Sequence, residues 1–451
     1  MTIRADAGKT IDRTAPETEP VNLFVLGLDD FNRDKLEAVA YDQPIRFHPV
    51  LDLAALTSSE DFDLEGTLKR AEAEIREHPK RAHGLVNYWD FPVSLLTAML
   101  AQRLGLPGPS LEAVLGCEHK YWSRLQQRQV APDHVPQFEA VDPFDDAAID
   151  AIGVDYPFWI KPVKGFSSHL GFRIGNRADL DRAIEEIRAE IAEIGNAFND
   201  FMAHAEVPRE VSNIGGNHCL VEGLIGGSQC TLEGFVHNGR MHAYGIVDSF
   251  RYPNGSSFSR YQYPSGLPRR VTSRMIEIAE AVLSRIGLDN NAFNMEFFWD
   301  QRRDRIWILE INPRISQSHG DLFQKVDGIP HHQVVTDLAM GIQPTWQPGE
   351  GVFPCAAKLF LRRFSDARVT RVPTADEIEA VIERFPGTLV EIPVVEGMLL
   401  SELEAQEQDS YSYNHAIIFM GERSGRRLLA NFNQLKEMLR FEFDENIGGV
   451  A

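Results

Sequence analysis

The sequence predicts an α/β protein whose N-terminal part is a small doubly wound unit. Residues 21–30 are a short apolar run that ends in glycine and acids, and the next ten residues have the spacing of an amphipathic helix. A second strand over 81–90 precedes a helix with Pro92 near its start and Gly105 near its end. Strand, turn and helix in this repeated order are typical of an open α/β sheet.

The length of 451 residues is enough for about three domains. After the N-terminal unit, a long amphipathic helix over 179–204 leads into three strands that break at 226–227 and at Asn238-Gly239, a strong hairpin signal. We expect a disordered tail, an N-terminal α/β domain, a central domain and a C-terminal α/β domain, over residues 1–20, 21–115, 116–350 and 351–451.

The amino-acid composition limits the classes of partner and the cellular compartment that we expect for this chain. The chain has 45 basic and 66 acidic residues and a net charge of -21, so its long-range field repels nucleic acids and anionic membranes. The four cysteines show no CxxC spacing, which argues against a zinc site and a disulfide framework. There is no signal-peptide pattern and no apolar run long enough to span a bilayer. We therefore expect a cytoplasmic protein that contacts neither nucleic acid nor membrane.

The most informative feature is a pair of strands over 293–300 and 305–312. Because successive side chains of a strand point to opposite faces, Glu296 lies on one face of the first strand and Glu310 on one face of the second. If residues 301–304 form the turn between antiparallel strands, the two glutamates fall opposite each other, with Cβ atoms about 5 Å apart.

Facing carboxylates repel each other and are costly to bury without a cation. Oxygen ligands on a rigid sheet suit Mg²⁺ or Mn²⁺, so Glu296 and Glu310 become candidate metal ligands, with Asn312 as a neutral third oxygen. Two residues later, Arg314 can bind a phosphate or carboxylate held by that metal. The alternative is a solvated sheet face on which the glutamates pair with neighbouring arginines, namely Arg302, Arg303 or Arg305.

Nucleotide-binding groups are candidates elsewhere in the chain. Lys161 follows an apolar strand and precedes a loop with two glycines and two hydroxyls, Ser167 and Ser168. Lys120 lies on a predicted helix beside Tyr121 and Trp122. Taken singly, each lysine is better explained as a solvated surface residue.

Taken in their order along the chain, these residues and motifs resemble those of the ATP-grasp superfamily over about residues 21–350. The resemblance is carried by a lysine before the lid, a second lysine in a "KP" strand, and three motifs with the sequences "VEGLIGG", "FNMEFF" and "LEINPR". It implies an ATP-grasp fold with an N-terminal pre-ATP-grasp domain and a mobile lid over about 155–222. The loop "GFSSHLG" has fewer glycines than many loops of this superfamily.

The resemblance also implies roles for single residues. Lys120 and Lys161 would hold the α- and β-phosphates of ATP, with Ser167 and Ser168 in the lid loop. Two Mg²⁺ ions would be bound by Glu296, Glu310 and Asn312, and the reacting acyl phosphate by Arg314. Adenine would meet Glu222 and the backbone through Ile225, and Glu233 is a candidate ribose ligand.

Within the superfamily, "GLPGPS", the segment 248–268 and the C-terminal "SYSYNHAIIFMG" are most similar to the amino-acid ligases. This implies an ADP-forming carboxylate-amine ligase that makes an amide or dipeptide bond through an acyl phosphate from two small-molecule substrates. The alternatives are a biotin-carboxylase-like enzyme that uses bicarbonate and a catalytically silent nucleotide-binding protein.

His319 and Asp90 lie at positions where catalytic or ligand-binding side chains are expected. His319 follows Arg314 by five positions and is a candidate for orienting the substrate or acting as a base, or for a hydrogen-bonded loop histidine. Asp90 ends the second predicted strand, where α/β clefts collect ligands, although an aspartate there is also a common helix cap. The oligomeric state stays open, with a homodimer as the commonest assembly.

Overall fold

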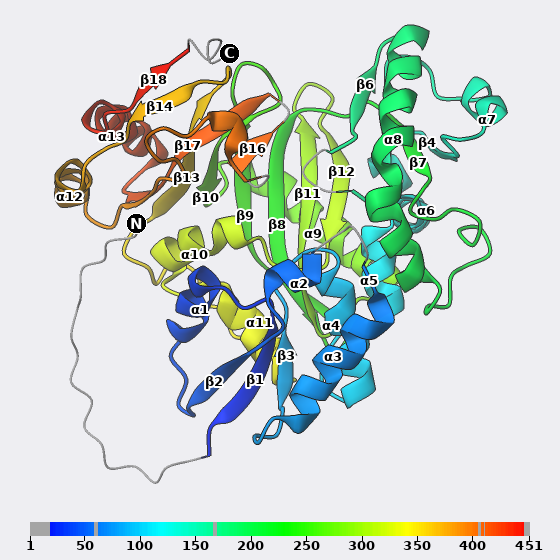
Figure 1. Ribbon diagram of the computed structural model, residues 1–451, viewed down its shortest axis with the longest axis horizontal. Helices are drawn as coiled ribbons and strands as arrows, with labels where there is room; N and C mark the ends of the chain where they lie inside the picture. The colour runs from blue at the N-terminus through cyan, green and yellow to red at the C-terminus, as the bar shows by residue number, and fades with distance from the viewer. Residues whose placement is uncertain (1–18, 58–61, 166–168, 405–406, 410, 446–451) are drawn as a thin grey trace.

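The computed structural model describes residues 19–57, 62–165, 169–404, 407–409 and 411–445. Its strands form sheets of three, nine and four strands and a separate two-stranded ladder (Figure 1). Ser167, Ser168 and residues 1–18 of the expected tail lie outside the described residues.

The N-terminal sheet is parallel, with the order β2-β1-β3. Alternate residues of β1 pack into two different cores, Phe24 on one face and Leu23 on the other, because helices cover both faces. The continuous apolar run therefore predicted this strand correctly. The elements are β1 (Val21–Leu26), α1 (Asp30–Glu37), β2 (Ile45–Val50), α2 (Leu53–Thr57), α3 (Leu64–Glu77), β3 (Gly84–Val86) and α4 (Val93–Leu104).

The start and end of α4 were predicted correctly. The helix follows Pro92, and Gly105 ends it with the left-handed φ of 64° that favours glycine. The strand expected second in the chain is in fact third, because β2 precedes it and was not among the predicted elements. It also ends at Val86, so Asp90 lies in the loop before α4 rather than at a strand end.

The four-stranded sheet lies beside the long helix α8, at the upper right of Figure 1. Its order is β4-β7-β5-β6, and the apolar face of α8 buries Ile184, Ile187 and Ile191 against it. The elements from α5 onward are α5 (Leu111–Glu118), α6 (Lys120–Val130), η1 (Pro132–His134), β4 (Phe138–Val141), α7 (Asp146–Asp150), β5 (Phe158–Pro162), β6 (Phe172–Ile174), α8 (Arg177–Met202) and β7 (Cys219–Gly223).

The large sheet forms the centre of the molecule, with the order β12-β11-β8-β9-β10-β13-β17-β15 and β16 paired to β17 (Figure 1). Asn238 and Gly239 form the hairpin predicted between β8 and β9, with φ of 52° and 69°. The strands and helices of this part are β8 (Ser228–His237), β9 (Arg240–Arg251), β10 (Phe258–Tyr263), α9 (Arg269–Ile286), β11 (Asn291–Asp300), β12 (Arg305–Asn312), η2 (Gln317–His319), α10 (Gly320–Asp327) and α11 (His332–Ala339).

Residues after 350 continue the same sheet. β13 pairs with β10, and β17 pairs with β13, so strands from both sides of the predicted boundary share one sheet. The division at residue 350 stays a prediction. The remaining elements are β13 (Cys355–Arg363), β14 (Arg368–Arg371), α12 (Ala375–Arg384), β15 (Leu389–Glu391), η3 (Leu400–Glu402), β16 (Gln408–Asp409), β17 (Ser412–Glu422), α13 (Gly425–Met438) and β18 (Glu442–Asp444).

Two expectations from composition concern this architecture. All four cysteines are buried and free, as expected for thiols outside a disulfide framework. None of the helices in the described ranges is long and apolar enough to cross a membrane.

Gly84 tests the contact between the N-terminal sheet and α11. A Cβ at this position would lie 1.8 Å from the backbone oxygen of Ala339, an atom that cannot move aside like a side chain. We expect Gly84→Ala to lower the free energy of unfolding by about 1–3 kcal/mol, the usual cost of overpacking, and calorimetry measures it. Gly153→Ala is the control, because its Cβ would meet nothing closer than 3.6 Å. Equal stability of the two variants would contradict the close contact.

Candidate active site

The two glutamates of the central strand pair face each other as predicted. β11 and β12 are antiparallel, and the register places Glu296 directly opposite Glu310 and Asn294 opposite Asn312. Just beyond this point the register shifts at a β-bulge, since Phe297 pairs with Ile308. The register brings both carboxylates to one face of the sheet.

Burial and repulsion act together on this acidic pair. They raise the pKa of Glu296 to about 7, burial being the larger cause and the charge of Glu310 the second. Gln229 on the neighbouring β8 donates its Nε2 to Glu296 Oε2 at 2.8 Å, which partly offsets this effect. At neutral pH the pair therefore attracts a proton or a cation strongly.

The residues around the pair are suited to a divalent cation whose coordination shell is completed by ligands from outside the chain. Asn312 donates its Nδ2 to Asn294 Oδ1 at 2.9 Å, which fixes its amide group at the end of β12. Across the described ranges, no group of three or more His, Cys, Asp or Glu side chains forms a metal site by itself. Two carboxylates and an amide oxygen leave coordination positions that phosphate oxygens suit.

The structure brings the two predicted lysines to the same place. Lys120, the first residue of α6, donates its Nζ to Gly165 O at 2.7 Å, at the base of the lid loop. Burial lowers the pKa of Lys120 to about 8, and the charge of Glu310 partly offsets this while Lys164 and Lys161 add to it. A cluster of ammonium groups beside carboxylates is suited to a polyphosphate.

Lys161 and Glu222 lie on adjacent lid strands and form an ion pair of 2.6 Å. Glu222 also accepts from Arg124 Nε at 2.9 Å, so both its oxygens bind cations, and Arg124 and Lys161 hold its pKa at about 2 against the opposing effect of burial. Ile225 follows in the segment between β7 and β8 and is partly exposed.

Arg124 is a site residue that the sequence analysis missed. Its Nη2 donates to Leu309 O at 2.8 Å, at the bulge beside Glu310, while its Nε reaches Glu222 in the lid sheet. Arg124 therefore joins the lid sheet to β12, the strand that carries Glu310. Its place four residues after Lys120, on the same helix face, was the available signal.

Glu233 and His319 form one buried pair. Glu233 Oε1 lies 2.8 Å from His319 Nδ1, and the two residues are 0% and 2% exposed. Burial raises the pKa of Glu233 well above its usual range and lowers the pKa of His319 to about 3. The lowered pKa makes His319 a weak base, and the 2.8 Å contact makes Glu233 a buried support for the loop after β12.

Arg314 projects from the end of β12 towards the N-terminal unit. Its Nη2 and Nε donate to Asp90 Oδ2 at 2.7 and 3.2 Å, and its side chain keeps 21% of its surface exposed. Its Nη1 also donates to Ile315 O at 3.3 Å, so the guanidinium is held by three hydrogen bonds while part of the side chain stays accessible to a ligand. The pairing with Asp90, which is 224 residues distant in the chain, could not be deduced from the sequence.

The same sheet face continues past the acidic pair with polar groups. Arg251 donates to Gln229 Oε1 at 2.8 Å, and Tyr261 on β10 lies opposite Lys358 on β13. Lys358 donates to Ser318 Oγ at 3.2 Å, in the loop that follows Arg314. The sheet face beside the acidic pair is therefore lined by charged and hydroxyl groups.

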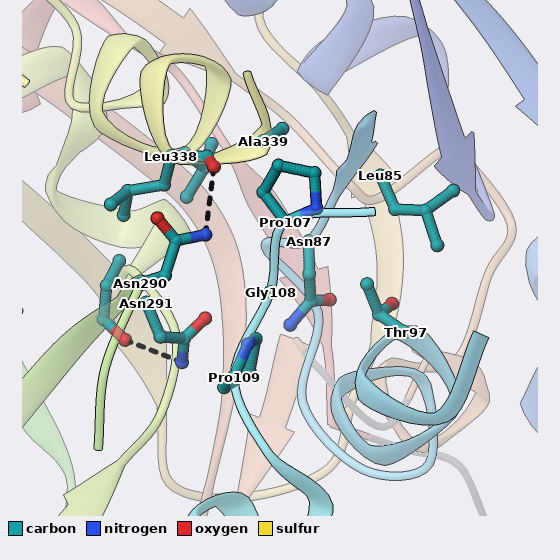
Figure 2. Close-up of a pocket in the computed structure, with 12 residues that line it drawn as sticks. Leu85, Asn87, Thr97, Pro107, Gly108, Pro109, Asn290, Asn291, Leu338 and Ala339 are labelled. Atoms are coloured by element: carbon teal, nitrogen blue, oxygen red, sulfur yellow. Dashed lines mark hydrogen bonds between the residues drawn. The ribbon is translucent and has the colours of Figure 1, made fainter. Parts of the chain in front are cut away.

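A small pocket lies apart from these residues, between the N-terminal unit and the start of β11 (Figure 2). Its volume of about 20 Å³ is room for roughly one water molecule. Within it, Asn290 donates to Leu338 O at 3.0 Å and Asn291 donates to Pro313 O at 2.7 Å. None of the predicted site residues lines it, so its part is to fix the strand end that leads to Arg314.

Comparison with known protein families gives a match over the part of the chain that holds both glutamates, Lys161 and Arg314. Residues 154–320 match the family described as ATP-grasp domain. Over this stretch the chain is similar to ATP-grasp domains. The carbamoyl phosphate synthase large chains of Kocuria rhizophila and Mycobacterium tuberculosis are 35% and 33% identical to it over 75 residues. That segment is 17% of this chain and 7% of each relative, so the chain spans a small fraction of these proteins' length.

Solved structures agree with the ATP-grasp fold over almost the whole chain. An L-amino acid ligase from Bacillus licheniformis has a TM-score of 0.68 at 16% identity, covering 94% of this chain and 99% of that one. A phosphoribosylglycinamide synthetase from Anaerococcus prevotii gives 0.60 at 12% identity, with 94% and 100% covered. A biotin carboxylase from Campylobacter jejuni gives 0.58 at 14% identity, with 94% and 92% covered. The expected ATP-grasp fold is therefore confirmed.

The raised pKa of Glu296 predicts how metal binding depends on pH. In the folded chain Glu296 keeps its proton up to about pH 7, whereas in the unfolded chain it does so only up to about pH 4.5. The contribution of Glu296 to the free energy of unfolding therefore falls as the pH rises between these values. If Glu296 is a ligand of Mg²⁺, binding of the metal with ATP would displace that proton, and the affinity should rise up to about tenfold per pH unit below 7. Calorimetry in buffers of different ionisation enthalpy measures the proton released.

Glu296→Gln serves as the comparison for this titration. The variant has no proton to displace, so its nucleotide affinity should be lower and nearly independent of pH from 5 to 7. A wild-type affinity that stays flat over this window would show that the acidic pair takes no part in metal binding.

Proposed function

We propose that this chain is an ATP-dependent, ADP-forming carboxylate-amine ligase that joins a carboxylate and an amine through an acyl phosphate. The observation that carries the proposal is the opposed pair Glu296 and Glu310, with Arg314 two residues past the end of the pair's second strand and two lysines beside it. Such an arrangement suits phosphoryl transfer, which depends on positioning and charge neutralisation.

ATP would be held between the lid sheet and the large sheet. Lys120 and Lys161 would bind its phosphates, the backbone through Ile225 its adenine, and Glu296, Glu310 and Asn312 the accompanying Mg²⁺. When bound, Mg²⁺ neutralises the phosphate charge. On nucleotide binding, Lys161 would share its ammonium between Glu222 and a phosphate, because the ion pair already places it at the cleft.

The reaction would then follow in two steps. A carboxylate oxygen of the first substrate attacks the γ-phosphorus, the bond from that phosphorus to the β-γ bridging oxygen breaks, and ADP leaves. The amine nitrogen of the second substrate attacks the acyl carbon, inorganic phosphate leaves, and the nitrogen loses a proton. Arg314 would hold the substrate carboxylate and the transferring phosphate in line, and the lid would exclude water.

Amino acids are the substrates that we favour. The L-amino acid ligase from Bacillus licheniformis shares the fold along 94% of this chain. The face with Arg251, Tyr261 and Lys358 offers charged and hydroxyl groups, which suit the carboxylates and amines of amino acids. Bicarbonate as the activated acid is the second candidate, since the fold is also shared with a biotin carboxylase.

A phosphate-release screen with ATP, Mg²⁺ and pairs of amino acids tests the proposal. We expect release that depends on both substrates, and we expect Glu310→Gln to reduce it by at least about 100-fold, as when a charge-stabilising group is removed from a transition state. The variant should stay folded, because it removes a carboxylate that repels Glu296.

Glu280→Gln, on the exposed side of α9, is the matched control and should keep full activity. Near-normal turnover of Glu310→Gln would rule out the metal role of the acidic pair. Release that requires bicarbonate rather than an amino acid would favour the carboxylase, and ATP binding without any release would favour a silent nucleotide-binding protein.

A further inference from the structure

Asp90 belongs to the N-terminal unit, yet its carboxylate lies inside the site. Oδ2 accepts both hydrogen bonds from Arg314, while Oδ1 accepts from the backbone N–H of Phe91 at 2.8 Å and lies 3.3 Å from Lys164 Nζ. One carboxylate therefore contacts a cation from the end of β12 and a cation from the base of the lid loop.

These contacts continue as a row of alternating charges. Lys164 is 5% exposed and forms a second ion pair with Glu118 of α5, at 2.8 Å, and Glu118 accepts from Ser94 Oγ at 2.5 Å. The row Arg314, Asp90, Lys164, Glu118 connects four segments of the chain. Burial alone would raise the pKa of Asp90, but Lys164 and Arg314 outweigh it and hold the pKa far below its usual range.

The backbone around Asp90 is itself firmly supported. Its carbonyl accepts from the N–H of Ser94 in the first turn of α4, and Trp89 donates its Nε1 to Gly27 O at 3.0 Å. Gln317, three residues after Arg314, donates to Tyr88 O at 3.3 Å. The loop before α4 and the loop after β12 are thus joined at two points, and Asp90 has little freedom to move away.

From this geometry we propose that Asp90 is a positioning residue: it fixes the Arg314 guanidinium against the reacting groups and ties the base of the lid loop to the same point. This inference rests on the proposed function, because Arg314 acts only if an acyl phosphate forms. Without Asp90, Arg314 loses the acceptor of its Nε and Nη2, and a flexible guanidinium misplaced by about 1 Å can cost roughly 100-fold in rate.

Asp90→Asn is the direct test, because it keeps the size of the side chain and removes its charge. With the substrate pair found in the phosphate-release screen, we expect kcat to fall about 10- to 100-fold, while the KM for ATP stays within twofold. Tyr41→Phe is the matched control: it removes another contact between the N-terminal unit and the rest of the chain, the 2.9 Å hydrogen bond to Asp337, and should leave kcat unchanged.

A double-mutant cycle separates positioning from a general structural effect. Lysine cannot donate from a planar fork, so Arg314→Lys should already lack the geometry that Asp90 maintains. In that background, Asp90→Asn should change kcat less than twofold.

Three results would overturn the inference: wild-type kcat in Asp90→Asn, an equal loss of kcat in Tyr41→Phe, or an undiminished effect of Asp90→Asn in the Arg314→Lys background. Failure of the proposed function gives a different result, because the wild-type chain itself would then release no phosphate with any substrate pair, and the role of Asp90 would be ruled out along with it.

Discussion

The repulsion between Glu296 and Glu310 is the constraint on which the site depends. Antiparallel pairing places the two carboxylates opposite each other, and burial makes their joint ionisation unfavourable without a cation. The strands hold this arrangement because the bulge beside Glu310 is secured by Arg124, which donates to the exposed carbonyl of Leu309. The fold thus carries a local electrostatic cost that binding of a metal with a nucleotide would remove.

A second feature is that the cations of the site are already paired within the chain. Lys161 contacts Glu222, Lys164 contacts Glu118, and Arg314 contacts Asp90. Paired charges tolerate burial far better than isolated ones, so the cationic cluster can be built in a chain of net charge -21 before any phosphate arrives. The pairing also orients each side chain, so little freedom is left to lose when a ligand binds.

Local signals in the sequence were sufficient for much of this structure. The turn after β11, the hairpin at Asn238-Gly239 and the helix that ends at Gly105 each depend on residues within a few positions of one another. Contacts between distant segments could not be predicted from the sequence, because nothing near Asp90 specifies that it contacts Arg314. The residue pattern of β2 also gave no clear strand signal. Ser167 and Ser168 lie outside the described residues, so their place in the lid loop stays a prediction.

In the proposed function, chemistry and substrate specificity would occupy different parts of one sheet face. The acidic pair lies on β11 and β12, the edge whose register is fixed by the bulge, whereas Tyr261 and Lys358 lie on β10 and β13, towards the C-terminal strands. ATP-grasp folds are shared by enzymes named for different acids and amines, so a fixed reaction centre must be compatible with variable substrate contacts. Because β13 and β17 extend the same sheet, changes among the C-terminal residues can reshape the substrate face while the register of Glu296 and Glu310 is kept.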